Sequence, residues 1–150
     1  MVIIRRETWE QYYPDCVPLW TAHHNELNST DPLDPDLSVI KRGMDSGNIV
    51  VLVARDNETM AGYCWWTFGK SVEIKDLLCA DQRLWYVDKP YRRGTVAYRL
   101  FKSSIDFLKS IGVRKIYPHH WFVGDSPKAA RIFESFGAKP EELVYSLWID

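Results

Sequence analysis

Cysteine is scarce in this chain of 150 residues. Cys16, Cys64 and Cys79 are an odd number, with no Cys-x-x-Cys spacing and no histidine clustered beside them. This arrangement argues against a disulfide framework and against a zinc site, and it is typical of a reducing compartment. We therefore expect no metal cofactor.

Long apolar runs and an excess of positive charge are also lacking. No run approaches the roughly 18 apolar residues that cross a bilayer, and residues 1–6 lack the layout of a signal peptide. The 19 basic and 20 acidic residues give a formal net charge of −1, which argues against a nucleic-acid-binding surface. We expect one cytoplasmic domain, residues 1–150, that binds neither membrane nor nucleic acid.

Aromatic residues, in contrast, are abundant, with seven Trp and eight Tyr. Aromatic side chains mostly serve burial, so a densely packed aromatic core is the first interpretation. An aromatic-lined binding site is the second.

The first half of the chain predicts a strand, two helices and a hairpin. Residues 2–6 read as a strand, and Thr8 reads as the N-cap of a helix that Pro14 and Pro18 interrupt. Asp34 followed by Pro35 predicts the cap and first position of the next helix, which ends at Gly47. The apolar stripe of that helix is Leu37, Ile40 and Met44. Residues 49–54 and 61–68 are the expected strands of the hairpin.

The second half predicts alternating strands and helices. The segment 72–81 is ambiguous between a bulged strand and a loop, and residues 84–87 read as strand. A helix is expected over 95–111, where Gly112 stops it, and another from Ser126 to Gly137. The remaining strands are expected at 113–121 and 143–149. The order β-α-α-β-β-β-α-β-α-β predicts a mixed α/β fold with helices on the faces of a central sheet.

The stretch from Leu84 to Phe101 has the composition of an anion site. A strand ends before Pro90, and Arg92 and Arg93 then precede the start of a helix. The first N–H groups of a helix have no intrahelical partners and lie at the positive end of its dipole. A phosphate can bind there, with the arginines closing over it.

These motifs resemble the acetyl-CoA-binding core of the GNAT N-acetyltransferase superfamily. The matching pieces are Trp85-Tyr86-Val87, Pro90, Arg92-Arg93-Gly94-Thr95-Val96-Ala97, Ser126-Pro127-Lys128-Ala129, Phe133 and Gly137-Ala138. The resemblance covers about residues 80–150 well and the order of elements before them loosely. The segment around Arg92 is also similar to small acetyltransferases of tailed phages.

The resemblance implies the GNAT fold, a central mixed and mostly antiparallel sheet flanked by helices, and an N-acetyltransferase that uses acetyl-CoA. It implies that the strand ending at Val87 pairs with the pantetheine arm, and that the N–H of Val87 polarises the thioester carbonyl. The implied cofactor-binding residues are Trp85, Tyr86, Val87, Arg92, Arg93, Gly94, Thr95, Val96, Ala97 and Ser126.

Three residues depart from the family pattern. Thr95 replaces the middle glycine of the phosphate loop, and Ser126 replaces the usual asparagine. Phe133 stands where many members carry the tyrosine that protonates the leaving thiolate, and a phenyl ring has no proton to give. That proton could instead come from water, Tyr117 or Ser126.

The acceptor amine needs a base that works near neutral pH. His119 and His120 follow each other on an expected strand, so they should point to opposite faces. His120 falls near the place where several family members carry a catalytic glutamate. Glu73, Asp76 and Asp81 are alternative bases acting through a water, and both histidines could instead be structural or exposed.

The resemblance also places the acceptor site at the first two helices. This region offers Trp20, His23, His24, Glu26, Asp31 and Asp34. Their acidic and aromatic character would suit a cationic amine, such as a polyamine, an aminoglycoside, lysine or a protein N-terminus, although a solvated helix end has the same composition. The alternative function is a catalytically weak acyl-CoA-binding or protein-interaction module, and a homodimer is compatible with either.

Overall fold

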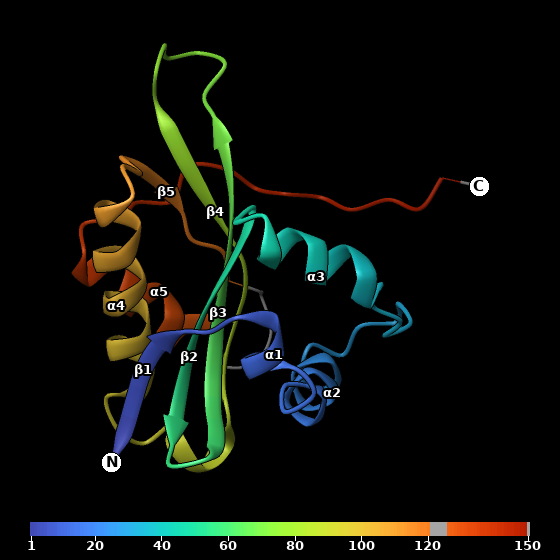
Figure 1. Cartoon of the computed structure of the whole chain (residues 1–150). Coiled ribbons are helices and arrows are strands. Elements are labelled where there is room, and N and C mark those ends of the chain that lie inside the picture. Colours follow the sequence, from blue (N-terminus) through green and yellow to red (C-terminus); the bar gives the residue numbers. More distant parts are fainter. Residues whose placement is uncertain (121–125, 150) are drawn as a thin grey trace.

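The computed structural model describes residues 1–120 and 126–149 and contains a five-stranded mixed sheet in the order β1-β2-β3-β4-β5 (Figure 1). The pairs β1–β2, β2–β3 and β3–β4 are antiparallel, and β5 runs parallel to β4. This arrangement confirms the fold class predicted from the sequence. The strands are β1 (Val2–Arg6), β2 (Ile49–Asp56), β3 (Thr59–Lys70), β4 (Leu78–Val87) and β5 (Lys115–Tyr117).

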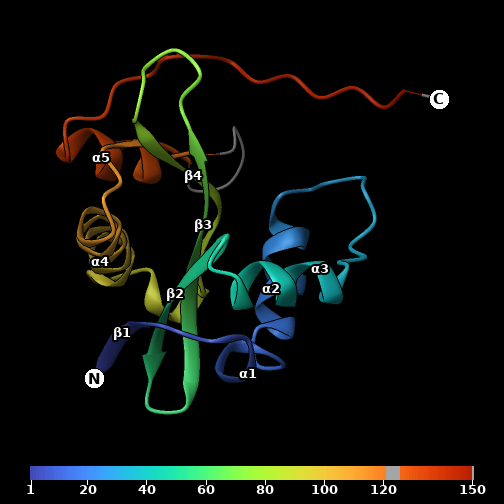
Figure 2. The same ribbon diagram turned by 45° about the horizontal axis from the view of Figure 1, so that its top comes forward.

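The helices divide between the two faces of the sheet (Figures 1 and 2). One face is covered by α1 (Trp9–Tyr12), α2 (Val17–Glu26) and α3 (Leu37–Asp45), and the other by α4 (Val96–Ser110) and α5 (Ser126–Ser135). A single 3-10 turn, η1 (Lys89–Tyr91), connects β4 to α4. Among the described helices, none combines the length and apolarity that crossing a bilayer requires.

Thr8 caps α1, as predicted, and the predicted interruption divides the first helix into α1 and α2. The Thr8 hydroxyl accepts from the Gln11 N–H, and the Gln11 side chain accepts from the Thr8 N–H, which is a capping box. Pro14 lies between α1 and α2, and Pro18 occupies the first turn of α2. The third helix begins later than expected: its cap is Asp36 rather than Asp34, because the Asp36 carboxylate accepts from the N–H groups of Ser38 and Val39.

Aromatic residues fill the core on both sides of the sheet. Towards α4 and α5, the buried side chains include Trp66, Phe101 and Phe133. Towards α1–α3, the phenol oxygen of Tyr12 accepts from the indole N–H groups of Trp20 and Trp65, at 2.7 and 2.9 Å. Most of the aromatic excess therefore serves burial.

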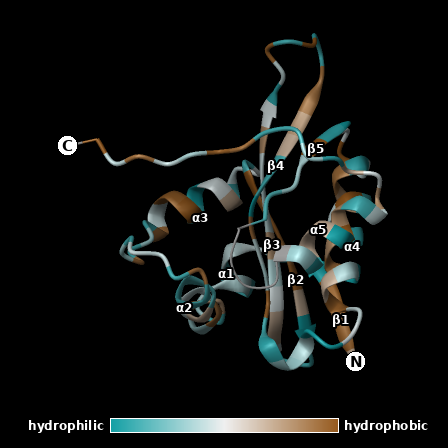
Figure 3. Ribbon diagram, turned by 180° about the vertical axis from the view of Figure 1, so that it is seen from behind, coloured by the Kyte–Doolittle hydropathy of each residue, from teal (hydrophilic) through white to brown (hydrophobic). Residues whose placement is uncertain are grey.

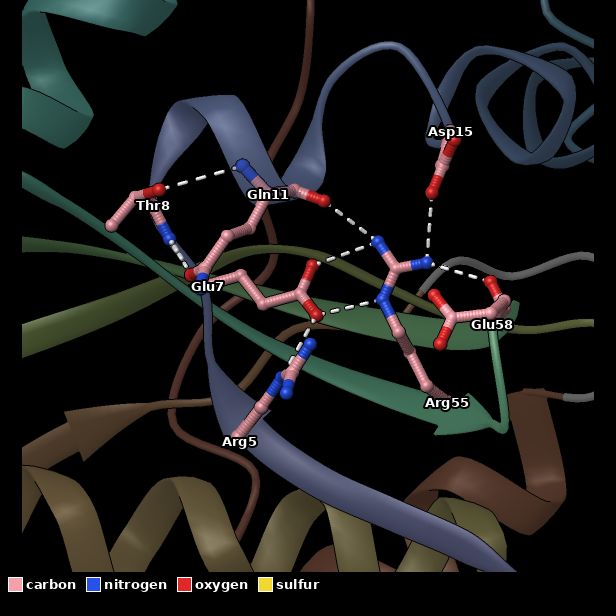
Figure 4. A network of polar contacts seen from close by, with 7 residues as sticks. All are labelled: Arg5, Glu7, Thr8, Gln11, Asp15, Arg55 and Glu58. Carbon is pink, nitrogen blue, oxygen red and sulfur yellow. Dashed lines mark hydrogen bonds and ion pairs between the residues drawn. The ribbon is translucent and has the colours of Figure 1, made fainter.

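A buried ion pair joins Glu7, the residue that follows β1, to Arg55 of β2 (Figure 4). The side chain of Glu7 is 0% exposed, and its two carboxylate oxygens accept from Nε and Nη2 of Arg55 at 2.7 and 3.0 Å. The same guanidinium also donates to Asp15 and to the carbonyls of Gln11 and Glu58. One arginine thus links the segment after β1, α1 and the β2–β3 turn.

The ambiguous segment 72–81 is partly strand, since β4 begins at Leu78, and β4 carries a β-bulge. Trp66 pairs with Gln82 and Trp65 pairs with Leu84, so Arg83 is the extra residue. A bulge shifts the alternation of side chains along its strand. Gln82 therefore lies opposite a residue of the α4–α5 side, whereas Leu84 lies opposite one of the α1–α3 side.

Two strand predictions near the C-terminus are wrong. The strand expected over 113–121 is limited to β5, because Pro118 cannot donate a ladder hydrogen bond; Trp121 lies outside the described residues. Residues 143–149 form no strand and extend away from the sheet (Figures 1 and 3). Their large apolar side chains are 65–88% exposed. An alternating sequence becomes a strand only where a neighbouring strand pairs with it, and this segment has none within the described chain.

Candidate active site

A cavity of about 420 Å³ opens between β4, the N-terminus of α4 and α5, and it reaches the C-terminal end of α2. The cavity therefore connects the N-terminus of α4, which the sequence predicts to be an anion site, with the end of α2, which the sequence predicts to be part of an acceptor site. Its lining residues are His23, Glu26, Leu27, Gln82, Arg83, Trp85, Tyr86, Val87, Arg92, Gly94, Thr95, Ala97, Tyr98, His119, His120, Lys128, Ala129, Arg131 and Ile132.

The end of β4 forms one wall of the cavity. Trp85 lies on the α4–α5 side, with its ring centroid 5.3 Å from Phe133 and 5.6 Å from Phe101. Tyr86 points to the other side and packs in the core beneath α2. Val87 ends the strand and also lines the cavity. Phe133 is 5% exposed and packs as a core residue.

The anion-site residues surround the start of α4. Gly94, Thr95 and Ala97 line the cavity, whereas Val96 is buried in the core and Arg93 is outside the lining residues. Thr95 is the N-cap, but its side chain makes no capping hydrogen bond. Since the helix is 15 residues long, its first N–H groups and its dipole present a site suited to a phosphate.

Arg92 binds other protein groups in this structure. Its Nε donates to the carbonyl of Val87 at 2.7 Å, and its Nη2 donates to both carboxylate oxygens of Glu26 at 2.8 Å. The guanidinium carbon lies 5.1 Å from the centroid of the Tyr86 ring. The predicted contact of Arg92 with a pyrophosphate stays a prediction, and the structure adds a second role, holding α2 against the end of β4.

Several polar and aromatic side chains close the α2 end of the cavity. The phenol of Tyr86 donates to Glu26 at 2.9 Å, and Nδ1 of His23 lies 2.9 Å from the phenol oxygen of Tyr63. Burial lowers the pKa of His23 to about 4, despite the opposing effect of the nearby Glu26 carboxylate. Burial also raises the pKa of Tyr86. The imidazole and the phenol are therefore both neutral near pH 7.

The remaining acceptor residues named from the sequence lie elsewhere. Trp20 is 7% exposed and belongs to the core. His24, Asp31 and Asp34 are not among the cavity-lining residues. Of the six, only His23 and Glu26 reach the cavity, because both lie on the buried side of the last turns of α2.

Both candidate histidines reach the cavity, rather than opposite faces of a strand. Residues 118–120 are not strand, so the expected alternation does not apply. His119 Nε2 lies 3.8 Å from Asp81 Oδ1, and the His120 ring centroid lies 6.3 Å from that of Phe133. Both histidines stay candidate bases.

Of the other predicted catalytic residues, Tyr117, Glu73 and Asp76 are not among the cavity-lining residues, and the side chain of Ser126 is not described. Tyr117 ends β5 outside the lining residues, with Lys115 Nζ 4.9 Å from its ring centroid. Ser126 begins α5, but its side chain lies outside the described residues. Glu73 and Asp76 are exposed in the β3–β4 turn.

Sequence reasoning missed Gln82, Tyr98, Lys128 and Arg131 as cavity residues. Lys128 and Arg131 are basic residues on consecutive turns of α5, and this spacing in the sequence could have indicated that they share one face. Nothing in the sequence marked Gln82, since its position depends on the bulge. Within residues 1–120 and 126–149, no three His, Cys, Asp or Glu side chains gather as a metal site would require.

No protein-family profile matches the chain, and no curated protein matches it in sequence. Solved structures do match. A ribosomal-protein-alanine N-acetyltransferase from Brucella melitensis biovar Abortus 2308 aligns with a TM-score of 0.77 and 15% identity over 100% of both chains. An aminoglycoside acetyltransferase from an uncultured soil metagenomic sample gives 0.81 and 14%, over 100% of this chain and 99% of that chain.

A third match, described as a predicted acetyltransferase with acetyl-CoA, comes from Clostridium acetobutylicum. It aligns with a TM-score of 0.75 and 12% identity over 98% of this chain and 96% of that chain. At these identities the likeness shows the fold, which is that of the GNAT acetyltransferases, as the sequence motifs predicted.

Proposed function

We propose that this chain, which has the GNAT fold, transfers an acetyl group from acetyl-CoA to a primary amine by direct attack. The observation that carries the proposal is the single cavity running from the N-terminus of α4 to Glu26 and His23 on α2. An anionic cofactor and a cationic acceptor can meet there within one continuous space. A single domain, a cytoplasmic location and compatibility with a homodimer remain part of this proposal.

The residues around α4 fit the phosphates of acetyl-CoA. The N–H groups of residues 94–97 and the hydroxyl of Thr95 would hold the pyrophosphate, together with the predicted Arg92 and Arg93. Lys128 and Arg131 add positive charge to the same cavity. When bound, acetyl-CoA supplies an activated acetyl thioester. The N–H of Val87 would polarise its carbonyl, as the resemblance implies.

The α2 end of the cavity fits a cationic amine. Glu26 supplies a carboxylate, and Tyr86 and His23 supply aromatic rings that burial keeps neutral. Polyamines, aminoglycosides, lysine side chains and protein N-termini share this chemistry. The structural neighbours named for ribosomal-protein-alanine and aminoglycoside acetylation act on such amines.

Removal of the amine proton is assigned to a histidine at the other edge of the cavity. We assign His120 as the base that removes the proton of the attacking amine, with His119 beside Asp81 as the alternative. Tyr117, Ser126 or water would protonate the leaving thiolate, because Phe133 cannot. Holding both reactants in one cavity itself contributes to the rate.

The proposal is tested by incubating the purified protein with acetyl-CoA and a panel of amines, while free thiol is measured. Amine-dependent thiol release is expected. Acetyl-CoA binding without thiol release from any amine would favour the alternative function, an acyl-CoA-binding or interaction module. Absence of binding would refute both.

A further inference from the structure

The two ring nitrogens of His23, which lines the cavity near the end of α2, have different surroundings. Nδ1 lies 2.9 Å from the phenol oxygen of Tyr63, a residue that is 0% exposed. Nε2 has no hydrogen-bond partner in the described part of the chain, yet it is not one of the fully buried polar atoms that lack a partner there. Nε2 therefore keeps access to solvent, and the cavity provides that access.

The surroundings of Tyr63 decide which nitrogen of His23 carries the proton. Burial raises the pKa of the Tyr63 phenol, so its O–H is intact near neutral pH. A buried O–H that donates to no acceptor loses its hydrogen bond to water without compensation. Among the described residues, the partner of this O–H is Nδ1 of His23. The Tyr63 O–H therefore donates to Nδ1, and Nδ1 carries no proton.

A neutral imidazole has one proton, which must lie on the nitrogen that does not accept. Burial lowers the pKa of His23 to about 4, so its ring is neutral near pH 7. The proton is therefore on Nε2, and His23 presents a hydrogen-bond donor to the cavity. Such a donor can neither bind an ammonium group nor remove its proton, because both require a free acceptor. It can bind an oxygen atom.

Tyr86 connects this donor with a carboxylate. The Tyr86 ring stacks on the His23 imidazole, with centroids 4.9 Å apart and an angle of 23°, and its phenol donates to Glu26 at 2.9 Å. His23 and Glu26 are at i,i+3 positions of α2, so they lie on the same side of the helix. Tyr86 and Arg92 use three of the roughly four lone-pair sites of the Glu26 carboxylate, which leaves room for one more donor.

We propose that His23 selects acceptor amines that carry a hydroxyl or carbonyl oxygen on the carbon next to the one that bears the amine. Glu26 binds the ammonium group, and His23 Nε2–H donates to the neighbouring oxygen. The inference rests on the proposed function, and it narrows the acceptor class. Sugar-like amino alcohols and protein N-termini carry such an oxygen, whereas polyamines and lysine side chains do not.

The tautomer of His23 can be tested without turnover. Nitrogen NMR chemical shifts of the ring should show a protonated Nε2 and an unprotonated Nδ1 in the wild-type protein at pH 7. Tyr63→Phe removes the O–H that Nδ1 accepts, so the share of the Nδ1-protonated form should rise. His24, which is not among the cavity-lining residues, should not respond to Tyr63→Phe. A wild-type His23 that is protonated on Nδ1 overturns the inference.

Two isosteric pairs of amines test the selection. Ethanolamine is compared with propylamine, and glycinamide with isobutylamine, by kcat/KM for thiol release and by calorimetric Kd in the presence of CoA. In the wild-type protein, one neutral hydrogen bond should favour the oxygen-bearing amine about five- to tenfold. A preference in the first pair alone indicates a sugar-like amino alcohol, and one in the second pair alone indicates a peptide N-terminus.

Three variants assign the preference to His23. His23→Phe keeps a ring but has no N–H, so the ratio within each favoured pair should fall by that same factor, and the basicity of the amines cancels in this comparison. His23→Gln can donate an amide N–H from about the place of Nε2, so it should keep part of the preference. His24→Phe is the control and should keep all of it. Thermal melts establish that each variant folds.

The outcomes separate this inference from the proposed function. If none of the amines binds or causes thiol release, the proposed function fails, and the inference fails with it. If amines react and the wild-type protein has the same ratios as His23→Phe, the proposed function stands and selection by His23 is refuted.

Discussion

Arg92 and Glu26 form a two-bonded ion pair between residues 66 positions apart in the sequence, joining the turn before α4 to the last residue of α2. Both side chains are about one quarter exposed. The pair therefore connects the part of the cavity that would hold the cofactor with the part that would hold the acceptor.

Glu26→Gln should lower the free energy of unfolding by about 1–2 kcal/mol, because it leaves a partly buried guanidinium without its carboxylate. Urea denaturation measures the change. Glu10→Gln, which removes an exposed ion pair with Lys41, is the control and should have little effect. Equal effects of the two variants would show that the Arg92 pair is no stronger than a surface contact.

Arg55→Met should be far more destabilising, by about 3–5 kcal/mol, because it removes the buried guanidinium that pairs with both carboxylate oxygens of the fully buried Glu7. Arg5 also contacts Glu7, at 3.2 Å, but its side chain is 57% exposed. Arg5→Met should therefore cost less than about 1 kcal/mol. Comparing the denaturation midpoints of the two variants distinguishes the buried Arg55–Glu7 pair from the exposed Arg5–Glu7 pair.

His23 should make the protein sensitive to mild acid. Burial lowers the pKa of its imidazole from 6.5 to about 4, so the unfolded chain binds more protons than the folded protein between these values. The contribution of His23 to stability is fully present above pH 6.5 and is lost as the pH falls towards 4. Between pH 7 and pH 5 the loss should be about 2 kcal/mol.

Unfolding curves of the wild-type protein, His23→Gln and His24→Gln at pH 7 and pH 5 test this expectation. Only His23→Gln should show a smaller difference between the two pH values. If the three differences agree, the His23 imidazole titrates normally and the stated burial effect is wrong.

Within the proposed reaction, His120→Gln should lower kcat by a factor of about 10² or more and remove the acid limb of the pH–rate profile. His119→Gln should keep that limb. The opposite result would transfer the role of base to His119 and its neighbour Asp81.

Truncation after Glu142 should leave the unfolding temperature nearly unchanged. The removed apolar side chains are 65–88% exposed, and their one side-chain hydrogen bond in the described structure joins Trp148 to Asp31 at the surface. Phe133→Ala, at a buried position, is the contrast and should cost about 3–5 kcal/mol. A large drop on truncation would mean that the segment packs against the body of the protein.

Features that depend on neighbouring residues in the sequence could be predicted. Thr8, Pro14, Pro18 and Gly112 start or stop helices through contacts within one turn, and the fold class followed from the resulting order of elements. The anion site at the start of α4 was predicted in the same way, from a strand, a turn and a helix start in succession, and Gly94, Thr95 and Ala97 of that prediction line the cavity.

Features that depend on pairing between distant segments could not be predicted. The position of Gln82 is set by its register against Trp66, and the orientation of Arg92 is set by Glu26 on another element. The segment 143–149 has the composition of a strand, but composition does not supply a partner. Pairing and packing decide these cases, and neither can be read from a local pattern.

The bulge at Arg83 implies that the register of β4 against β3, as well as the residue types of β4, decides which side chains line the cavity. Inserting one residue between Trp65 and Trp66 would give Arg83 a partner, restore regular alternation and turn the residues on one side of the former bulge to the opposite face of the sheet. Gln82 and Trp85 would then lie on opposite faces, although neither had been replaced. A single-codon insertion in β3 would therefore change the wall of the cavity.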